Sequence, residues 1–263
     1  MSVPDHVVFT ARDGEWFVAK TLEAADMSNE NVAHFLAALS NTVSSRMAGY
    51  LGEVMDVEGL MELAGEVEGC DLGDCVAFLK SPKTSRKLGS LVYEKDKKLR
   101  KLLVDVARGL LVGEVIEGLS YPEKELPGKA VRPRFEGRHV DFTAKHGRWI
   151  VVKRILIDEK TKGVDVAYVL AGINDTAVSK LPDYAGIDMG GIEGKLGVKK
   201  KVRKSEIPAL VEAYLSLDVS EFAPEEFAPH AKVQALRLLL ESIGLPPGVP
   251  VKPLKKYVEK AFT

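Results

Sequence analysis

The stretch His6–Lys20, HVVFTARDGEWFVAK, aligns without a gap with His139–Lys153, HVDFTAKHGRWIVVK. The only two tryptophans of the chain, Trp16 and Trp149, fall on the same position of this alignment. In both stretches, apolar and β-branched residues flank a turn that contains glycine, which is a pattern typical of a β-hairpin. The sequence therefore predicts two equivalent hairpins, one in each half of the chain.

The match continues after a shift of one residue, with Val32–Thr42, VAHFLAALSNT, on Val166–Thr176, VAYVLAGINDT. The apolar residues of these segments recur at helical spacing. A weaker match pairs Lys101–Asp105 with Arg237–Glu241. Such a collinear series indicates an internal duplication. We predict an α+β fold that contains two copies of a hairpin-plus-helices module, related by a pseudo-two-fold axis as in a homodimer.

The boundary between the copies is predicted in the proline-rich stretch 120–134, so that residues 1–125 form the first copy and residues 126–263 the second. Outside the aligned blocks, amphipathic patterns predict further helices at about 95–119, 205–217, 231–243 and 253–262.

The composition is that of a folded globular protein, with 46% hydrophobic residues in 263. No apolar stretch reaches the roughly 18 residues of a membrane span, and the first residues do not resemble a signal peptide, so we expect a cytoplasmic protein without a membrane partner. The chain has one Gln and four Asn beside abundant Lys and Glu, which is typical of a heat-adapted protein.

Residues 1–130 carry 15 basic and 21 acidic side chains, whereas residues 131–263 carry 22 and 17. The halves therefore differ by about eleven charges (−6 against +5), which suggests different partners. The densest basic run, Lys199–Lys204, has the acidic residues Glu66, Glu68 and Asp71 near the corresponding place in the first copy.

Clustered cations are how proteins neutralise phosphates, although a solvated loop in front of a helix at Ser205 is an equally good interpretation of one basic run. The candidate nucleic-acid contacts are Lys199, Lys200, Lys201, Arg203 and Lys204 in the run, Lys145, Arg148, Lys153 and Arg154 around the second hairpin, and Arg46 and Lys180 after the aligned helices.

Two patterns concern the aligned helices. A polar break at Ser40 and at Asn174, each followed by Thr, Ser and a basic residue, gives the segments a faint helix-turn-helix character, but core helices with polar caps are the favoured interpretation.

The same segments, LAALSNT and LAGINDT, resemble the repeated helix of LAGLIDADG homing endonucleases. Val43 and Ala177 stand where that family has its metal-binding carboxylate, so the resemblance implies a nucleic-acid-binding relic that does not cleave.

No complete catalytic set is found, because phosphate-loop, nucleophile-elbow and zinc-protease motifs are all missing from the sequence. The only cysteines, Cys70 and Cys75, lack the spacing of a metal site and are interpreted as buried or idle thiols. We therefore expect neither a cofactor nor a metal site, and the protein is more naturally a binding protein than an enzyme.

Our first hypothesis is a non-enzymatic nucleic-acid-binding protein that contacts phosphates mainly through its second copy. The alternative is a structural or assembly protein of viral or mobile-element type, which self-associates when the acidic first copy of one molecule meets the basic second copy of another. An unrecognised nuclease is the third and least supported hypothesis.

Overall fold

A computed structural model describes residues 6–13, 15–23, 28–120, 129–131, 135–136, 139–146, 148–156, 162–254 and 256. The chain divides into two compact units, and each is described by itself. The first unit contains residues 1–53, 125–185 and 250–263, and the second contains residues 54–124 and 186–249. Each unit thus takes segments from both halves of the sequence.

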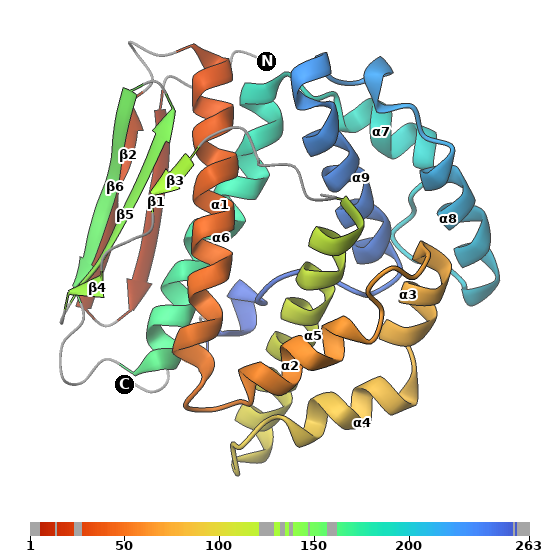
Figure 1. The fold of residues 1–263 in the computed structure, drawn as a ribbon, viewed down its shortest axis with the longest axis horizontal. Helices are drawn as coiled ribbons and strands as arrows, with labels where there is room; N and C mark the ends of the chain where they lie inside the picture. The colour runs from red at the N-terminus through yellow and green to blue at the C-terminus, as the bar shows by residue number, and fades with distance from the viewer. Residues whose placement is uncertain are drawn as a thin grey trace. The chain divides into compact units, whose positions relative to one another are not determined.

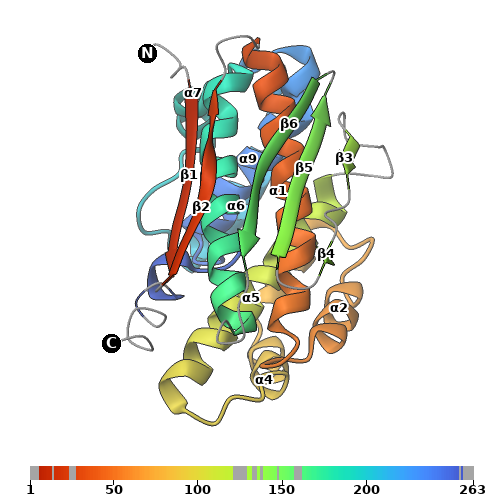
Figure 2. The same cartoon turned by 90° about the vertical axis from the view of Figure 1, so that its left-hand side faces the viewer.

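The strands lie in the first unit (Figures 1 and 2). One antiparallel hairpin consists of β1 (His6–Asp13) and β2 (Glu15–Glu23), and the other consists of β5 (His139–His146) and β6 (Arg148–Leu156). Two short strands, β3 (Lys129–Val131) and β4 (Phe135–Glu136), also pair with β5.

The two hairpins have the same register. Arg12 lies opposite Trp16 in the first, and Lys145 lies opposite Trp149 in the second. Each hairpin also has a register shift near the middle of its first strand, after Val8 or Val140. A one-residue slip would move every side chain of a strand to the opposite face of the sheet. The shared register therefore means that equivalent side chains of the two hairpins lie on equivalent faces. The side chains of both tryptophans lie outside the described residues.

Two long helices of the first unit, α1 (Asn29–Leu51) and α6 (Gly163–Ala185), lie side by side against the hairpins (Figure 1). The contacts with the strands are reciprocal: β1 contacts α6, whereas β5 contacts α1, and β2 lies beside β6 (Figure 2). Each helix therefore covers the hairpin of the other half of the chain.

The helices α1 and α6 run antiparallel. Ser40 Oγ donates a hydrogen bond to Asn174 Oδ1 at 2.6 Å near the middle of the pair, and the start of α6 at Gly163 lies close to the end of α1 at Tyr50. A methyl group on Gly163 would overlap the carbonyl oxygen of Tyr50, so glycine is what permits this close approach. Ser40 and Asn174 are equivalent positions of the two aligned segments, so the helices cross where like residues meet.

The helix-turn-helix alternative is wrong, because α1 continues without a turn through Ser40 and Asn41. The helix α6 likewise continues through Asn174 and contains Pro182 near its end. The polar residues that gave the appearance of a break instead supply the hydrogen bond between the two helices.

The second unit surrounds the long helix α5 (Lys97–Ser120), which contacts α2 (Val57–Gly65), α3 (Leu72–Leu79), α4 (Pro82–Ser90) and α9 (Ala228–Ser242). The other helices of this unit are α7 (Met189–Leu196) and α8 (Ile207–Leu215), with the short 3-10 helices η1 (Lys204–Glu206), η2 (Val219–Glu221) and η3 (Glu225–Phe227). Its core includes the fully buried Leu103, Val106 and Leu111 of α5 and Leu236 of α9.

Side-chain caps define where the short helices begin. The carboxylates of Asp56, Asp71 and Asp188 and the hydroxyl of Ser81 each accept a hydrogen bond from a backbone N–H in the first turn that follows. Such a cap satisfies one of the N–H groups that have no partner within the helix. In the part of the chain that the structure describes, no helix is both long and apolar enough to cross a membrane.

The predicted fold class, an α+β fold built from two hairpin-plus-helices modules, requires correction. Helices dominate the described chain, and the described part of the second unit contains helices and connecting segments but no strand. The compact units do not correspond to one predicted module each, because both combine segments of the two halves. The physical reason is that the apolar faces of α1 and α6 are buried against each other instead of within separate modules.

We predict that Ser40 and Asn174 are energetically coupled. Replacing Ser40 by Ala leaves the part-buried amide oxygen of Asn174 without its donor, which should cost about 1–3 kcal/mol of unfolding free energy. In a double-mutant cycle with Asn174→Ala, denaturant unfolding should give a coupling energy near 1 kcal/mol. As a control, Ser179→Ala removes only a local bond to the carbonyl of Thr176 on an exposed face and should change little. A zero coupling energy would show that this bond does not stabilise the helix pair.

Candidate functional site

The basic run Lys199–Lys204 connects α7 to η1 in the second unit. Gly197 ends α7 with a left-handed backbone (φ 65°), and the chain then leaves the helix. Glu206 holds the following loop, because its Oε2 accepts the backbone N–H of Arg203 at 2.8 Å and its Oε1 lies 3.3 Å from Lys199 Nζ. These bonds lower the pKa of Glu206, so the carboxylate stays ionised and continues to hold the loop.

The remaining cations of the run are exposed. Lys200, Lys201, Arg203 and Lys204 all face solvent, and none forms a salt bridge with a carboxylate of the described chain. Beneath the loop is a hollow of about 240 Å³, which has the apolar side chains Leu196, Val202 and Leu210 in its lining. The run is thus a loop held by Glu206 over an apolar base, with four exposed side-chain charges.

Two further cations of the second unit, Lys80 and Arg108, have unusual surroundings. Lys80 caps the C-terminal end of α3, and its Nζ donates to the carbonyl of Ile243 at 2.6 Å. Burial lowers the pKa of Lys80, and the positive charges of Lys204 and Arg108 lower it further. Like charges raise the electrostatic energy of a site unless an anion joins them.

Arg108 lies on α5, among the buried residues Val106, Ala107 and Leu110. One terminal nitrogen of its guanidinium, Nη2, donates to Ser85 Oγ of α4 at 3.0 Å, whereas Nε is buried without a hydrogen-bond partner in the described chain. A buried donor of this kind is uncommon in proteins and calls for a partner such as water or a ligand.

The other predicted contacts lie in the first unit. Lys180 is on α6, with its Nζ 3.9 Å from a carboxylate oxygen of Asp183. The remaining ones are distributed over α1, β5 and β6, and their side chains lie outside the described residues: Arg46, Lys145, Arg148, Lys153 and Arg154. The structure therefore gathers only the Lys199–Lys204 part of the predicted set in the second unit, and it adds Lys80 and Arg108 there.

Sequence reasoning missed Lys80 and Arg108 because they are distant in sequence from the run and from each other. The one signal for Arg108 is its position in VDVARGLLVGEV, a segment that is otherwise largely apolar. A long cation on the apolar face of a helix is unusual and usually needs a partner.

A second concave region, a cleft of about 620 Å³, lies between α2, the turn that follows it and the end of α5. Apolar residues such as Met61, Val67 and Val115 line it together with the carboxylates of Glu68, Glu114 and Glu117. Both cysteines are free thiols in its lining, and burial raises the pKa of Cys75 to about 11. At neutral pH this thiol is protonated and therefore a poor nucleophile.

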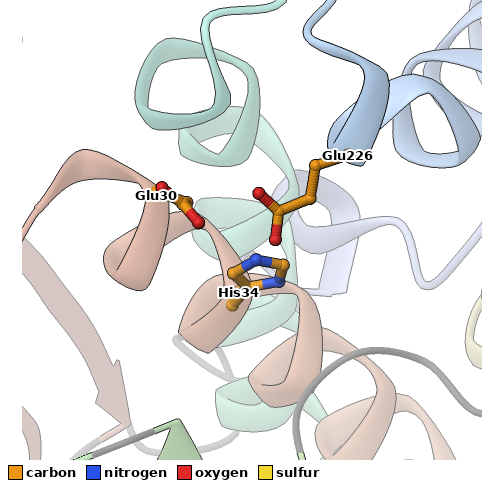
Figure 3. Close-up of side chains that lie close together, drawn as sticks. All are labelled: Glu30, His34 and Glu226. Atoms are coloured by element: carbon orange, nitrogen blue, oxygen red, sulfur yellow. The ribbon is translucent and has the colours of Figure 1, made fainter.

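Glu30 and His34 lie one turn apart at the start of α1 in the first unit (Figure 3). Glu30 is exposed, whereas His34 is buried. Figure 3 also draws Glu226, which comes from η3 of the second unit and therefore does not belong to a site of the first. One carboxylate and one imidazole supply two ligands, fewer than the three or four protein ligands of a zinc centre.

The acidic cleft predicts a pH-dependent stability. Burial raises the pKa of Glu114, and the charge of Glu117 raises it further. Ionising Glu114 in the folded state therefore costs free energy above its raised pKa, and this cost disappears as the pH falls through that pKa. Glu114→Gln should raise the melting temperature at neutral pH, with a smaller gain at mildly acidic pH. The exposed Glu62 provides the control, since Glu62→Gln should have little effect; a lower melting temperature for Glu114→Gln at neutral pH would refute this assignment.

Comparisons with known proteins place the chain in a family. A family model described as "Domain of unknown function (DUF2666)" matches residues 4–120 and again residues 137–261, two stretches that coincide with the predicted copies. The chain is 41% identical to a Pyrococcus furiosus protein whose crystal structure is described as that of a DUF2666 family member. The two superpose with a TM-score of 0.69 over 97% of this chain and all of the other.

The chain is also 29% identical over 132 residues to an uncharacterised protein of Methanocaldococcus jannaschii, a match that covers 46% of this chain and 94% of that protein. That relative thus corresponds in length to one copy. Both relatives come from thermophilic archaea, in agreement with the amide-poor composition of this chain. The chain belongs to the DUF2666 family.

Proposed function

We propose that this protein is a non-enzymatic nucleic-acid-binding protein that contacts phosphates mainly through Lys199–Lys204. The observation that carries the proposal is the loop itself, which exposes Lys200, Lys201, Arg203 and Lys204 without a salt-bridging carboxylate in the described chain. Exposed, unpaired lysine and arginine side chains are the groups that displace counterions from nucleic-acid phosphates.

The two interactions of the Glu206 carboxylate also support the proposal. It neutralises only Lys199, while its second oxygen is occupied by the backbone of Arg203. One acid therefore fixes the loop and leaves most of its positive charge uncompensated. A loop whose conformation is already set loses less conformational entropy when a partner binds.

The self-assembly alternative is less well supported than nucleic-acid binding, because it requires acidic residues that are free to meet a neighbouring molecule. Glu66 of the first copy already forms an ion pair with Lys87 across α2 and α4. That bond lowers the pKa of Glu66, so breaking the pair to meet a neighbouring molecule would cost this interaction. Glu68 and Asp71, which are both exposed, form no salt bridge in the described chain, although the Asp71 carboxylate caps α3. We further propose that the protein functions in the cytoplasm of a heat-adapted cell, where nucleic acid is the most abundant polyanion.

We predict that Lys200→Ala with Lys201→Ala weakens nucleic-acid binding and reduces its dependence on salt. On duplex DNA, each lost phosphate contact should reduce the slope of log affinity against log salt by about 0.9. The measurement is a salt series with single- and double-stranded DNA and RNA. A control that removes the same charge is Lys252→Ala with Lys256→Ala, two exposed lysines of the first unit, which should leave the slope unchanged.

Two results would contradict the proposal. One is a wild-type chain without salt-sensitive affinity for any nucleic acid. The other is a shift toward monomers, without nucleic acid, after neutralising either the basic run or Glu66 and Glu68; this outcome would support self-assembly instead.

A further inference from the structure

We propose that Cys70 and Cys75 are a redox site, at which a reversible disulfide bond forms across the start of α3. Both cysteines are free thiols, and both belong to the lining of the acidic cleft. They stand on either side of Asp71, the residue whose carboxylate caps α3. The site lies in a part of the second unit that the proposed function does not use.

The cap of α3 places the two side chains next to each other. Asp71 is the N-cap, so Cys70 immediately precedes the cap and Cys75 is the fourth residue of the helix. Residues at these two positions contact each other in a hydrophobic staple, and cysteine behaves as a small apolar residue there. Asp71 Oδ1 accepts the backbone N–H of Asp74 at 2.8 Å, and the carbonyl of Asp71 accepts that of Cys75 at 3.0 Å. The backbone between the two thiols is therefore fixed.

The sulfur of Cys75 points back toward Cys70. Cys75 Sγ lies 3.9 Å from the carbonyl oxygen of Cys70 and 3.9 Å from that of Val67. A carbonyl oxygen is about 2.4 Å from the Cα of its own residue, so this sulfur lies within roughly 6.5 Å of the Cys70 Cα. A sulfur bonded to Cys70 would lie roughly 4 Å from that Cα, so rotation of the two side chains brings the sulfur atoms into bonding range.

The exposure of the two thiols sets the order of the reaction. Cys70 is half-buried in the wall of the cleft, whereas Cys75 is buried. The Cys70 thiolate attacks a low-molecular-weight disulfide such as oxidised glutathione, which forms a mixed disulfide and releases one glutathione. The Cys75 thiolate then attacks the Cys70 sulfur and releases the second glutathione. Two cysteine thiols are thereby oxidised, one glutathione disulfide is reduced, and the two cysteine protons end on the two glutathione thiols.

The high pKa of Cys75 slows the second step without preventing it. Little of this thiol is ionised at neutral pH, but a thiolate of high pKa is a strong nucleophile, and the cap holds it beside the sulfur that it attacks. The bond would join α3 to the turn that follows α2, in which Gly69 has a left-handed backbone (φ 76°). Oxidation would therefore fix one wall of the acidic cleft.

The test treats the folded, full-length chain with oxidised glutathione at mildly alkaline pH and measures its intact mass. We expect a monomer that has lost two hydrogen atoms, retains no glutathione and has no thiol left for iodoacetamide after denaturation. A reductant should restore both thiols. The oxidised chain should melt about 5 °C above the reduced chain, because the bond restricts the unfolded state.

Cys75→Ser and Cys70→Ser are the matched variants, since each leaves one thiol. In Cys75→Ser the more accessible Cys70 should retain one glutathionyl group, because no second thiol releases it. In Cys70→Ser the buried Cys75 should stay reduced. The wild-type measurement and Cys70→Ser do not alter the buried residue, so they decide the question even if Cys75→Ser destabilises α3.

Three results would overturn the proposal. The first is a wild-type chain that retains glutathione as Cys75→Ser does. The second is a folded chain that keeps both thiols under conditions that oxidise the denatured chain, since the thiols would then be a structural contact only. The third is a disulfide between two chains. None of these measurements contains nucleic acid, so the redox site and the proposed function stand or fall separately.

Discussion

The packing of α1 against α6 is the interaction on which the first unit depends. The two helices bury residues such as Leu36, Val43 and Ala177 almost completely, and they cross antiparallel where Ser40 meets Asn174. Because each helix also covers the hairpin of the other half, neither half can bury its own apolar surface alone. The contacts between the halves resemble an isologous dimer interface, in which equivalent residues meet near the axis.

The second unit follows a different rule, because its geometry is set by short capped helices packed around α5. A single residue at each cap fixes where a helix starts. In addition, the backbone near Gly248 approaches the backbone of α5 closely at Gly109. Gly248 N–H donates to the carbonyl of Gly109 at 2.7 Å, and a methyl group on Gly109 would overlap Gly248. In the same unit, α3 packs against α4, α5 and α8.

The sequence predicted the features that repeat or that are long. The hairpins and the aligned helices were visible because two copies of one pattern reinforce each other, and α5, α8 and α9 were visible because their apolar periodicity extends over several turns. The helices α2, α3, α4 and α7 were missed, since each has only eight or nine residues, too few for a periodic signal. Their caps at Asp56, Asp71, Ser81 and Asp188 were the available signal.

The candidate site was predictable only in part, for a related reason. A run of cations such as Lys199–Lys204 is local and can be read directly from a sequence. The packing of α3 against α5 and α8 and the bond from Lys80 to the carbonyl of Ile243 join elements that are far apart in the sequence, and no local pattern encodes them. The compact units likewise combine segments of both copies, because the partner of α1 lies in the other half of the chain.

The central claim is that each compact unit is completed by both copies, with α6 as the partner of α1. The most direct measurement is the solution mass and thermal unfolding of a fragment containing residues 1–125, alone and mixed with residues 126–263. The account predicts that the fragment alone is unfolded or self-associates through the exposed face of α1, and that the second fragment restores a cooperative one-to-one complex. A fragment of residues 1–125 that remains a monomer and unfolds in one cooperative transition would contradict the account.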